Sequence, residues 1–227
     1  MASCGRVSAD DLIGADRPGL ANASSTVGPG RFQIEAGVYR DNTADADATS
    51  LATPVLLRYG VSDSFELRVE GNGYQRASAS ETVDGWAPVS LGFKYRFAEE
   101  HARHPAVGLI ARVFPPSGSG EFRGDHTTGD VTLTADKSLG DHWSVNPNLG
   151  VVWGEDDGRF TSALAALTVQ YGFTPSVGVF VDSAWQRPEA PAGHSAGVID
   201  LDGTDGATAA RCRAGGRLSG RMHFSWG

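Results

Sequence analysis

The sequence has no apolar run approaching the roughly 18 residues that a transmembrane helix needs. It also shows no apolar repeat at helical spacing and no glycine-rich phosphate loop between a strand and a helix. Cysteine is scarce: Cys4 and Cys212 lie near opposite ends, which allows one bridge but no disulfide framework and no metal site. Basic residues are outnumbered, with 19 Lys and Arg against 27 Asp and Glu, and this balance argues against a nucleic-acid partner.

Signals of export and of catalysis are missing as well. The first twenty residues contain no apolar h-region of about 7–15 residues, so no signal peptide is expected in the chain as given. Ser119 lies in SGSG and not in the G-x-S-x-G frame of a nucleophile elbow. The carboxylates at 155–157 and the pair His101 and His104 lack the spacing of a metal loop. We therefore expect no catalytic residue, no enzyme activity, no metal and no cofactor.

The sequence does contain a strong alternation with a period of two. In residues 143–153, WSVNPNLGVVW, the odd positions are apolar and the even positions are mostly polar or small, which indicates a strand. Trp143 and Trp153 stand at the two ends of its apolar face. At about 3.3 Å per residue and a tilt of about 40°, they are about 25 Å apart in height, which matches the apolar band of an outer-membrane barrel. Indole rings prefer the membrane interface.

The same alternation recurs along most of the chain. Strands are expected near residues 31–39, 51–59, 65–70, 86–97, 105–114, 130–136, 143–153, 162–171 and 177–186, and a tenth strand within 194–203. The segment 65–70 is the most informative, because Leu67 and its apolar neighbours alternate with Glu66, Arg68 and Glu70. Such a strand separates lipid from water in a membrane barrel, or core from solvent in a soluble one. Both interpretations are open at this point.

The connections alternate in length. The longer, polar ones are 41–50, 75–85, 115–129, 154–159 and 187–193, and the tighter ones are 60–64, 98–104, 138–142 and 172–176. Short turns at one rim and longer loops at the other are typical of outer-membrane barrels. The sequence therefore predicts an all-β fold, an up-and-down antiparallel transmembrane β-barrel of about 10–12 strands, incomplete at the C-terminus. We divide it into an irregular N-terminal arm (1–29), the barrel (30–203) and an atypical C-terminal tail (204–227).

Five segments carry a resemblance to a known family. They are ADRPGL (15–20), GPGRFQIEAGVY (28–39), RYGVSDSFELRVEGNGY (58–74), LGFKYRF (91–97) and SLGDHWSVNPNLGVVW (138–153). Over residues 15–197 the chain resembles the bacterial outer-membrane transporter family named for the MetA pathway of phenol degradation. The resemblance implies an exported barrel of about a dozen strands that passes small, often aromatic, organic compounds. The tail departs from the family, because two further amphipathic strands are expected where arginines stand among small residues.

The face opposite the apolar one is charged. We expect it to line the barrel interior, through Glu35, Arg58, Glu66, Arg68, Glu70, Lys94, Arg96, Arg112, Asp130, Asp136 and Asp182. Cross-strand ion pairs Arg58/Glu66 and Arg96/Glu70 are predicted from the hairpin order. These side chains would form either a selectivity lining or a polar plug. An aromatic girdle is expected from Tyr59, Phe97, Trp143, Trp153, Tyr171 and Trp185.

The functional prediction follows from this architecture. We expect a channel or transporter for small organic solutes in the outer membrane of a Gram-negative cell, with outer-membrane lipid and the solute as partners. The oligomeric state is not predicted. The alternatives are a soluble lipocalin-like barrel that binds an apolar ligand and a non-conducting structural barrel. The orientation of Leu67 relative to Glu66 decides between a membrane barrel and a soluble one, since only in a membrane barrel do apolar side chains point outward.

Overall fold

The computed structural model describes residues 16, 21–43, 48–155, 158–174, 177–186, 196–204 and 218–224. The first eight strands are β1 (Phe32–Ala36), β2 (Tyr39–Thr43), β3 (Ala48–Ala52), β4 (Val55–Gly60), β5 (Phe65–Gly71), β6 (Tyr74–Ser78), β7 (Thr82–Trp86) and β8 (Val89–Ala98). The remaining strands are β9 (Ala106–Phe114), β10 (Thr128–Leu139), β11 (Trp143–Glu155), β12 (Arg159–Thr174), β13 (Val177–Gln186), β14 (Ala196–Thr204) and β15 (Leu218–Phe224). A 3-10 helix, η2 (Gly120–Phe122), lies between β9 and β10. None of the helical structure in these ranges could span a membrane.

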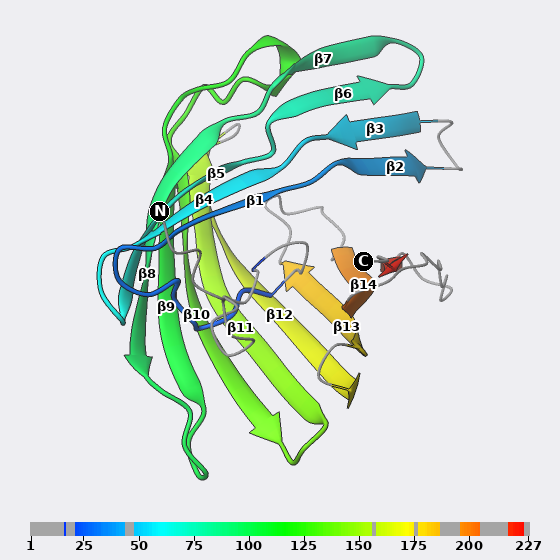
Figure 1. Ribbon diagram of the computed structural model, residues 1–227. Helices are drawn as coiled ribbons and strands as arrows, with labels where there is room; N and C mark the ends of the chain where they lie inside the picture. Colours follow the sequence, from blue (N-terminus) through cyan, green and yellow to red (C-terminus); the bar gives the residue numbers. More distant parts are fainter. Residues whose placement is uncertain are drawn as a thin grey trace, which may run out of the picture.

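Eleven strands form one strongly curved sheet in the order β1-β4-β5-β8-β9-β10-β11-β12-β13-β14-β15 (Figure 1). The pairing is antiparallel from β1 to β14, as the up-and-down prediction requires. The fold is therefore all-β with the strand order of an up-and-down barrel. Within the described strands β1 pairs with β4 alone and β15 with β14 alone, so the barrel is not closed there.

The end of the sheet corrects one detail of the prediction. In the tail, where the sequence indicates a strand only through Met222, Phe224 and Trp226, residues Leu218–Phe224 form β15. This last strand runs parallel to β14, whereas an up-and-down barrel has antiparallel neighbours throughout. A parallel pair cannot be joined by a tight hairpin, and residues 205–217 separate the two strands in the sequence.

Two connections that were predicted to be polar loops are in fact strand hairpins. Residues 41–50 belong largely to β2 and β3, and residues 75–85 to β6 and β7; together these strands form a second, four-stranded sheet, β2-β3-β6-β7. In Figure 1 it projects from the upper end of the curved wall. Each of its strands continues a strand of the main sheet after a break of two residues. The prediction failed here because polar composition alone does not distinguish a loop from a strand with both faces solvated.

Proline and glycine explain where these strands break. Pro54 stands between β3 and β4 and Pro88 between β7 and β8, and a proline cannot donate a hydrogen bond to the sheet. Gly73, between β5 and β6, has a φ of +61°, which is unfavourable for residues with a side chain. A Cβ at Gly73 would lie 2.1 Å from the carbonyl oxygen of Thr53, so the break between β5 and β6 packs directly against the break between β3 and β4.

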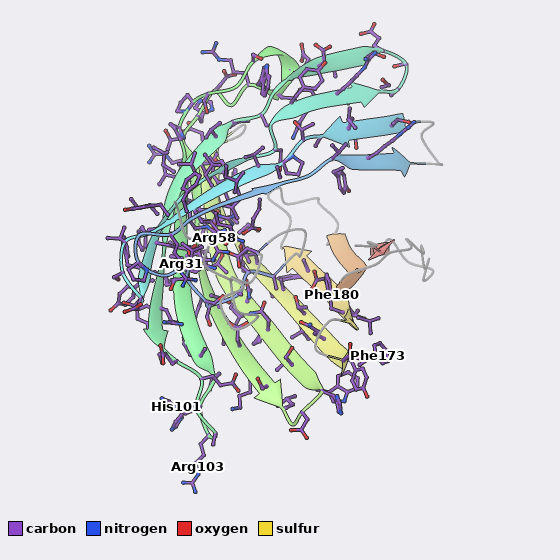
Figure 2. The ribbon with its side chains drawn as sticks, viewed as in Figure 1. Arg31, Arg58, His101, Arg103, Phe173 and Phe180 are labelled. Carbon is purple, nitrogen blue, oxygen red and sulfur yellow. The ribbon has the colours of Figure 1, made fainter. Side chains whose placement is uncertain are left out.

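The orientation of the side chains is the reverse of that in a soluble barrel. On β5, Leu67 is 48% exposed whereas Glu66 is fully buried, and on β11 Leu149 is 62% exposed whereas Asn148 is buried. Figure 2 shows Arg58 on the inner side of the curved sheet. Apolar side chains thus cover the outside and polar ones fill the inside, as expected for a wall in contact with lipid. The soluble lipocalin-like alternative is wrong, since it requires the opposite orientation.

Four tight turns lie at a single rim. They connect β4 to β5, β8 to β9, β10 to β11 and β12 to β13, as the sequence predicts. The β8–β9 hairpin carries His101 and Arg103 at its tip, at the lower rim in Figure 2. At the opposite rim the 154–159 connection is shorter than predicted, because β11 and β12 stay paired up to Glu155 and Arg159. The long β9–β10 connection folds back onto β7, where Ser119 bonds both backbone groups of Trp86.

Candidate functional site

The N-terminal arm, here meaning Asp16 and residues 21–30, is bound to side chains on the inner face of the curved sheet. Its backbone N–H groups donate to side chains of the wall: Asp16 to Glu35 at 2.9 Å, Asn22 to Asn148 at 2.8 Å and Val27 to Glu66 at 3.0 Å. An extended segment without strand partners has free N–H groups, and buried carboxylates and amides are suitable acceptors for them. Part of the polar interior is therefore occupied by the chain itself. The sequence predicted the arm to be irregular, but not its position.

The strongest contacts of the arm are made by the Asp16 carboxylate. Its Oδ2 atom accepts hydrogen bonds from Arg68 Nη1 at 2.5 Å and from Lys94 Nζ at 2.6 Å, and lies 3.8 Å from Arg58 Nη2. All four side chains are buried or nearly so. Glu66 joins the same group through Arg58 at 3.0 Å and Arg68 at 3.0 Å. We call these five residues the charged cluster.

The register explains why the charged cluster needs carboxylates at its centre. Arg58 on β4 lies directly opposite Arg68 on β5, and Glu66 on β5 lies opposite Lys94 on β8. Like charges directly opposite each other destabilise a sheet. Glu66 accepts hydrogen bonds from both arginines, and Asp16 reaches Lys94 as well as Arg68. The repulsion between the cations is thereby compensated.

The electrostatic environment of Asp16 is dominated by these cations. Burial by itself raises the pKa of the Asp16 carboxyl, but Lys94, Arg68 and Arg58 together outweigh burial and hold the pKa well below its ordinary value. The cations therefore favour the ionised form of Asp16. One donor of the site is still unused: Arg68 Nε is buried and has no hydrogen-bond partner among the described residues.

A second charged group lies beside the charged cluster. Arg112 donates to both carboxylate oxygens of Asp130, with Nε–Oδ2 at 2.9 Å, and also pairs with Glu70. Glu70 in turn accepts from Arg68 at 3.3 Å, so the two groups are linked. The predicted pair of Arg58 with Glu66 is confirmed.

The predicted pair of Arg96 with Glu70 is wrong. The β5–β8 register places Ser90 opposite Glu70, so Arg96 is six residues farther along β8. Arg96 instead lies near the rim with the short turns, where it pairs with Glu99 at 3.0 Å and donates to the backbone oxygen of Asp63. Hairpin order alone predicted which strands are neighbours, but not the register between them.

An amide and hydroxyl network forms the part of the inner face that sequence reasoning missed. Asn146 and Asn148 on β11 donate to Thr134 on β10, and both also donate to the backbone oxygen of Asn22 in the arm. Asn146 further donates to Asp136 at 2.8 Å. The signal was present in the sequence, since Asn146 and Asn148 stand on the polar face of their strand, but the prediction considered only charged residues.

The other predicted lining positions also have defined places. Glu35, Arg58, Glu66, Arg68, Glu70, Lys94, Asp130 and Asp182 are buried, and Arg96, Arg112 and Asp136 are partly exposed. Asp182 accepts a hydrogen bond from Thr168 on the neighbouring strand, and Asp136 accepts one from the backbone N–H of Ser24. Whether these side chains contact a passing solute stays a prediction.

The predicted girdle residues lie on the outer face. Tyr59, Phe97, Trp143 and Trp185 are exposed, and Trp153 and Tyr171 are partly exposed. Trp143 and Tyr171 are cross-strand neighbours with ring centroids 4.8 Å apart. Trp86, which is exposed and was not predicted, packs against Tyr74 with centroids 5.9 Å apart. Their role at a membrane interface stays a prediction.

Histidines and acidic residues do not gather into a metal site in the described part of the chain. No three or more His, Cys, Asp or Glu side chains there are placed to hold an ion. His101 and His104 face each other across a tight turn through backbone hydrogen bonds. Asp156 and Asp157 of the acidic loop lie outside the described residues.

Comparison with known families shows which family the chain belongs to. A family model described as "Putative MetA-pathway of phenol degradation" matches residues 15–209, which include the arm residue Asp16 and the whole antiparallel part of the sheet. The chain belongs to this family. This family, abbreviated Phenol_MetA_deg, is the one predicted from the strand and turn motifs, and the prediction is thus confirmed. No curated protein sequence matches the chain.

A solved structure shows the same fold. It is the crystal structure of the COG4313 outer membrane channel from Pseudomonas putida F1, with a TM-score of 0.50 and 16% sequence identity. The match covers 78% of this chain and 77% of that chain. The β-barrel fold of the Phenol_MetA_deg protein is therefore established independently of its sequence motifs.

Proposed function

We propose that this Phenol_MetA_deg protein is an outer-membrane channel for small organic solutes and has no catalytic activity. The observation that carries the proposal is the inverted side-chain orientation, with Leu67 and Leu149 outside and the charged cluster inside. A wall that is apolar outside and polar inside suits a path for solutes across lipid. The family description points to phenol degradation, and the structural neighbour is described as an outer membrane channel. The family description supports small organic solutes as the cargo, and the neighbour's description supports a channel.

The orientation in the membrane follows from the rims. In outer-membrane barrels the short turns lie on the periplasmic side and the longer connections outside the cell. The rim that carries the β8–β9 and β10–β11 turns then faces the periplasm, and the sheet β2-β3-β6-β7 extends outward. Trp143 and Tyr171 lie near the periplasmic end of their strands, where aromatic rings favour the interface.

Solute flux into proteoliposomes tests the proposal. Phenyl glucoside is a suitable probe because it is aromatic and organic, yet too polar to cross lipid unaided. We expect liposomes with the folded protein to admit phenyl glucoside faster than liposomes without protein, and a glycoside of similar size without an aromatic ring to enter more slowly. A lack of flux for phenyl glucoside and for every other small aromatic solute, both in the full chain and in a variant without the arm, contradicts the proposal.

A non-conducting structural barrel is the second candidate, and the position of the arm favours it. Asp16, Asn22 and Val27 all bond the inner wall, so part of the interior is filled. Deletion of residues 1–27 separates the two candidates. If the deletion variant conducts phenyl glucoside and the full chain does not, the arm closes a channel. If neither conducts, the barrel is structural.

A further inference from the structure

We propose that Arg58, Arg68 and Lys94 form a binding site for one organic carboxylate, and that Asp16 of the N-terminal arm fills this site as an internal ligand. The inference rests on the proposed function, because a solute reaches these side chains only by entering the barrel. It adds a ligand class, a monoanionic organic acid, and a competitor within the chain.

The geometry is that of a carboxylate site. The three cations come from β4, β5 and β8, which are consecutive strands of the sheet. A single oxygen, Asp16 Oδ2, lies 2.5 Å from Arg68 Nη1, 2.6 Å from Lys94 Nζ and 3.8 Å from Arg58 Nη2. Two short charge-assisted hydrogen bonds and a third cation converge on this position. A carboxylate oxygen of a solute could make the same contacts.

The wall alone does not satisfy Lys94. Its ammonium group donates to Asp16 Oδ2 at 2.6 Å and to the backbone oxygen of Ser25 at 3.1 Å, and both acceptors belong to the arm. The nearest wall carboxylate is that of Glu66, at 4.0 Å. A fully buried ammonium group without acceptors is strongly unfavourable. When the arm withdraws, the site therefore favours an anion in its place.

Charge balance favours a single negative charge. Around the three cations, the wall carboxylates of Glu35 and Glu66 supply two negative charges and Asp16 supplies the third. Glu70 also accepts from Arg68, but Arg68 shares it with Arg112. The neighbouring Arg112 is shared by two carboxylates, those of Glu70 and Asp130, so that group carries an excess negative charge. A monoanion matches the site, whereas the second charge of a dianion would be repelled by this group.

Two further features suit an organic acid. Arg68 Nε is buried with no partner in the described part of the chain, so the site has one donor that the arm does not use. Ile110 on β9 lies directly opposite Lys94, and Leu56 is two residues from Arg58 on the same face; both are fully buried on the inner side. Apolar side chains are rare on this face and could pack against the body of the acid.

Benzoate binding to the full chain in detergent micelles tests the proposal, with calorimetric titration as the measurement. Benzyl alcohol is the neutral ligand of the same shape. The Asp16→Asn variant removes the internal carboxylate at constant size, and Asp141→Asn makes the same charge change in the β10–β11 turn. If the arm fills the site in at least nine of ten molecules, Asp16→Asn should bind benzoate at least tenfold more tightly than the wild type. Asp141→Asn should leave the affinity unchanged.

The specificity of the effect is checked in two ways. Adding Lys94→Met to Asp16→Asn should reduce benzoate affinity at least tenfold, and benzyl alcohol should bind equally to all variants. Equal benzoate affinity in the wild type and Asp16→Asn overturns the proposal, and so does a parallel gain for benzyl alcohol. If phenyl glucoside still passes the wild-type protein, the proposed channel function stands even when benzoate binding fails; if nothing passes, the function fails independently.

A second measurement leaves the site intact and is decisive if Asp16→Asn does not fold. A Cys212→Ser chain keeps Cys4 of the N-terminal segment as the single attachment point for an environment-sensitive fluorophore. Benzoate should shift its emission in a saturable manner as the arm is displaced, and benzyl alcohol at the same concentration should not. No shift with benzoate, or equal shifts with both ligands, contradicts competition between Asp16 and a carboxylate.

Discussion

Replacing Leu149 by arginine tests the lipid-facing orientation of the sheet directly. Leu149 is 62% exposed and lies on β11, six residues from Trp143 and four from Trp153. At about 3.3 Å per residue and a tilt of about 40°, it stands about 15 Å in height from one indole and about 10 Å from the other, close to the bilayer midplane. An arginine there costs about 2–4 kcal/mol in a membrane. On the surface of a soluble protein the same change costs about 0.5 kcal/mol or less.

Leu139→Arg is the matched control. Leu139 is 50% exposed and lies opposite Trp143 at the end of β10, so its arginine would reach the interface and cost about 0–1 kcal/mol. The free energy of unfolding is measured by equilibrium denaturation in lipid vesicles, followed by tryptophan fluorescence. We expect Leu149→Arg to be less stable than Leu139→Arg by at least about 1 kcal/mol. Equal, small losses in both variants would refute the membrane assignment.

Three further predictions concern the breaks, the ion pairs and the arm. Gly73→Ala should impair folding, since its Cβ would meet a backbone oxygen at 2.1 Å. Gly140 also has a positive φ, of +73°, but open space around it, so Gly140→Ala should cost only about 1–2 kcal/mol; the folded fraction on unheated gels compares the two variants. Arg58→Met should cost about 3–5 kcal/mol, because it removes the buried cation that Glu35 and Glu66 share. Arg96→Met at the rim should cost about 0–1 kcal/mol, and both losses are measured by denaturation. The pKa of Asp16 is lowered in the folded protein, so the stability that the Asp16 carboxylate contributes is fully present above the ordinary aspartate pKa and is lost only as pH falls below that range. The Cys4 fluorophore should therefore report no release of the arm between pH 8 and pH 5. Release within that interval contradicts the assignment.

The alternation of side chains was sufficient to predict which face each strand turns inward. Leu67 and Glu66 point in opposite directions because successive residues of a strand face opposite sides. The same rule placed Arg58, Lys94 and Asp182 inside. It did not predict the second sheet, because its strands have no consistently apolar face, and a period-two signal disappears when neither face is consistently apolar.

The register between neighbouring strands could not be predicted from the sequence, for a different reason. Shifting one strand by two residues keeps every side chain on its face, so the alternation cannot distinguish Ser90 from Arg96 as the partner of Glu70. The pairing of Arg58 with Glu66 was predictable because the tight turn between β4 and β5 limits the register of that hairpin. Between β5 and β8 the intervening hairpin β6–β7 removes this constraint.

The position of the arm follows from the charges inside the barrel more than from the arm's own sequence. Its residues are small and polar, with no periodicity, and nothing among them indicates a partner. The wall, however, presents Arg58 opposite Arg68, and among the described residues both acceptors of Lys94 within 3.5 Å belong to the arm. Such an arrangement is stable only if a carboxylate from elsewhere enters it. An unbalanced cation on an inward-facing strand is therefore a signal, readable once the register is known, that a segment of the chain or a ligand occupies the interior.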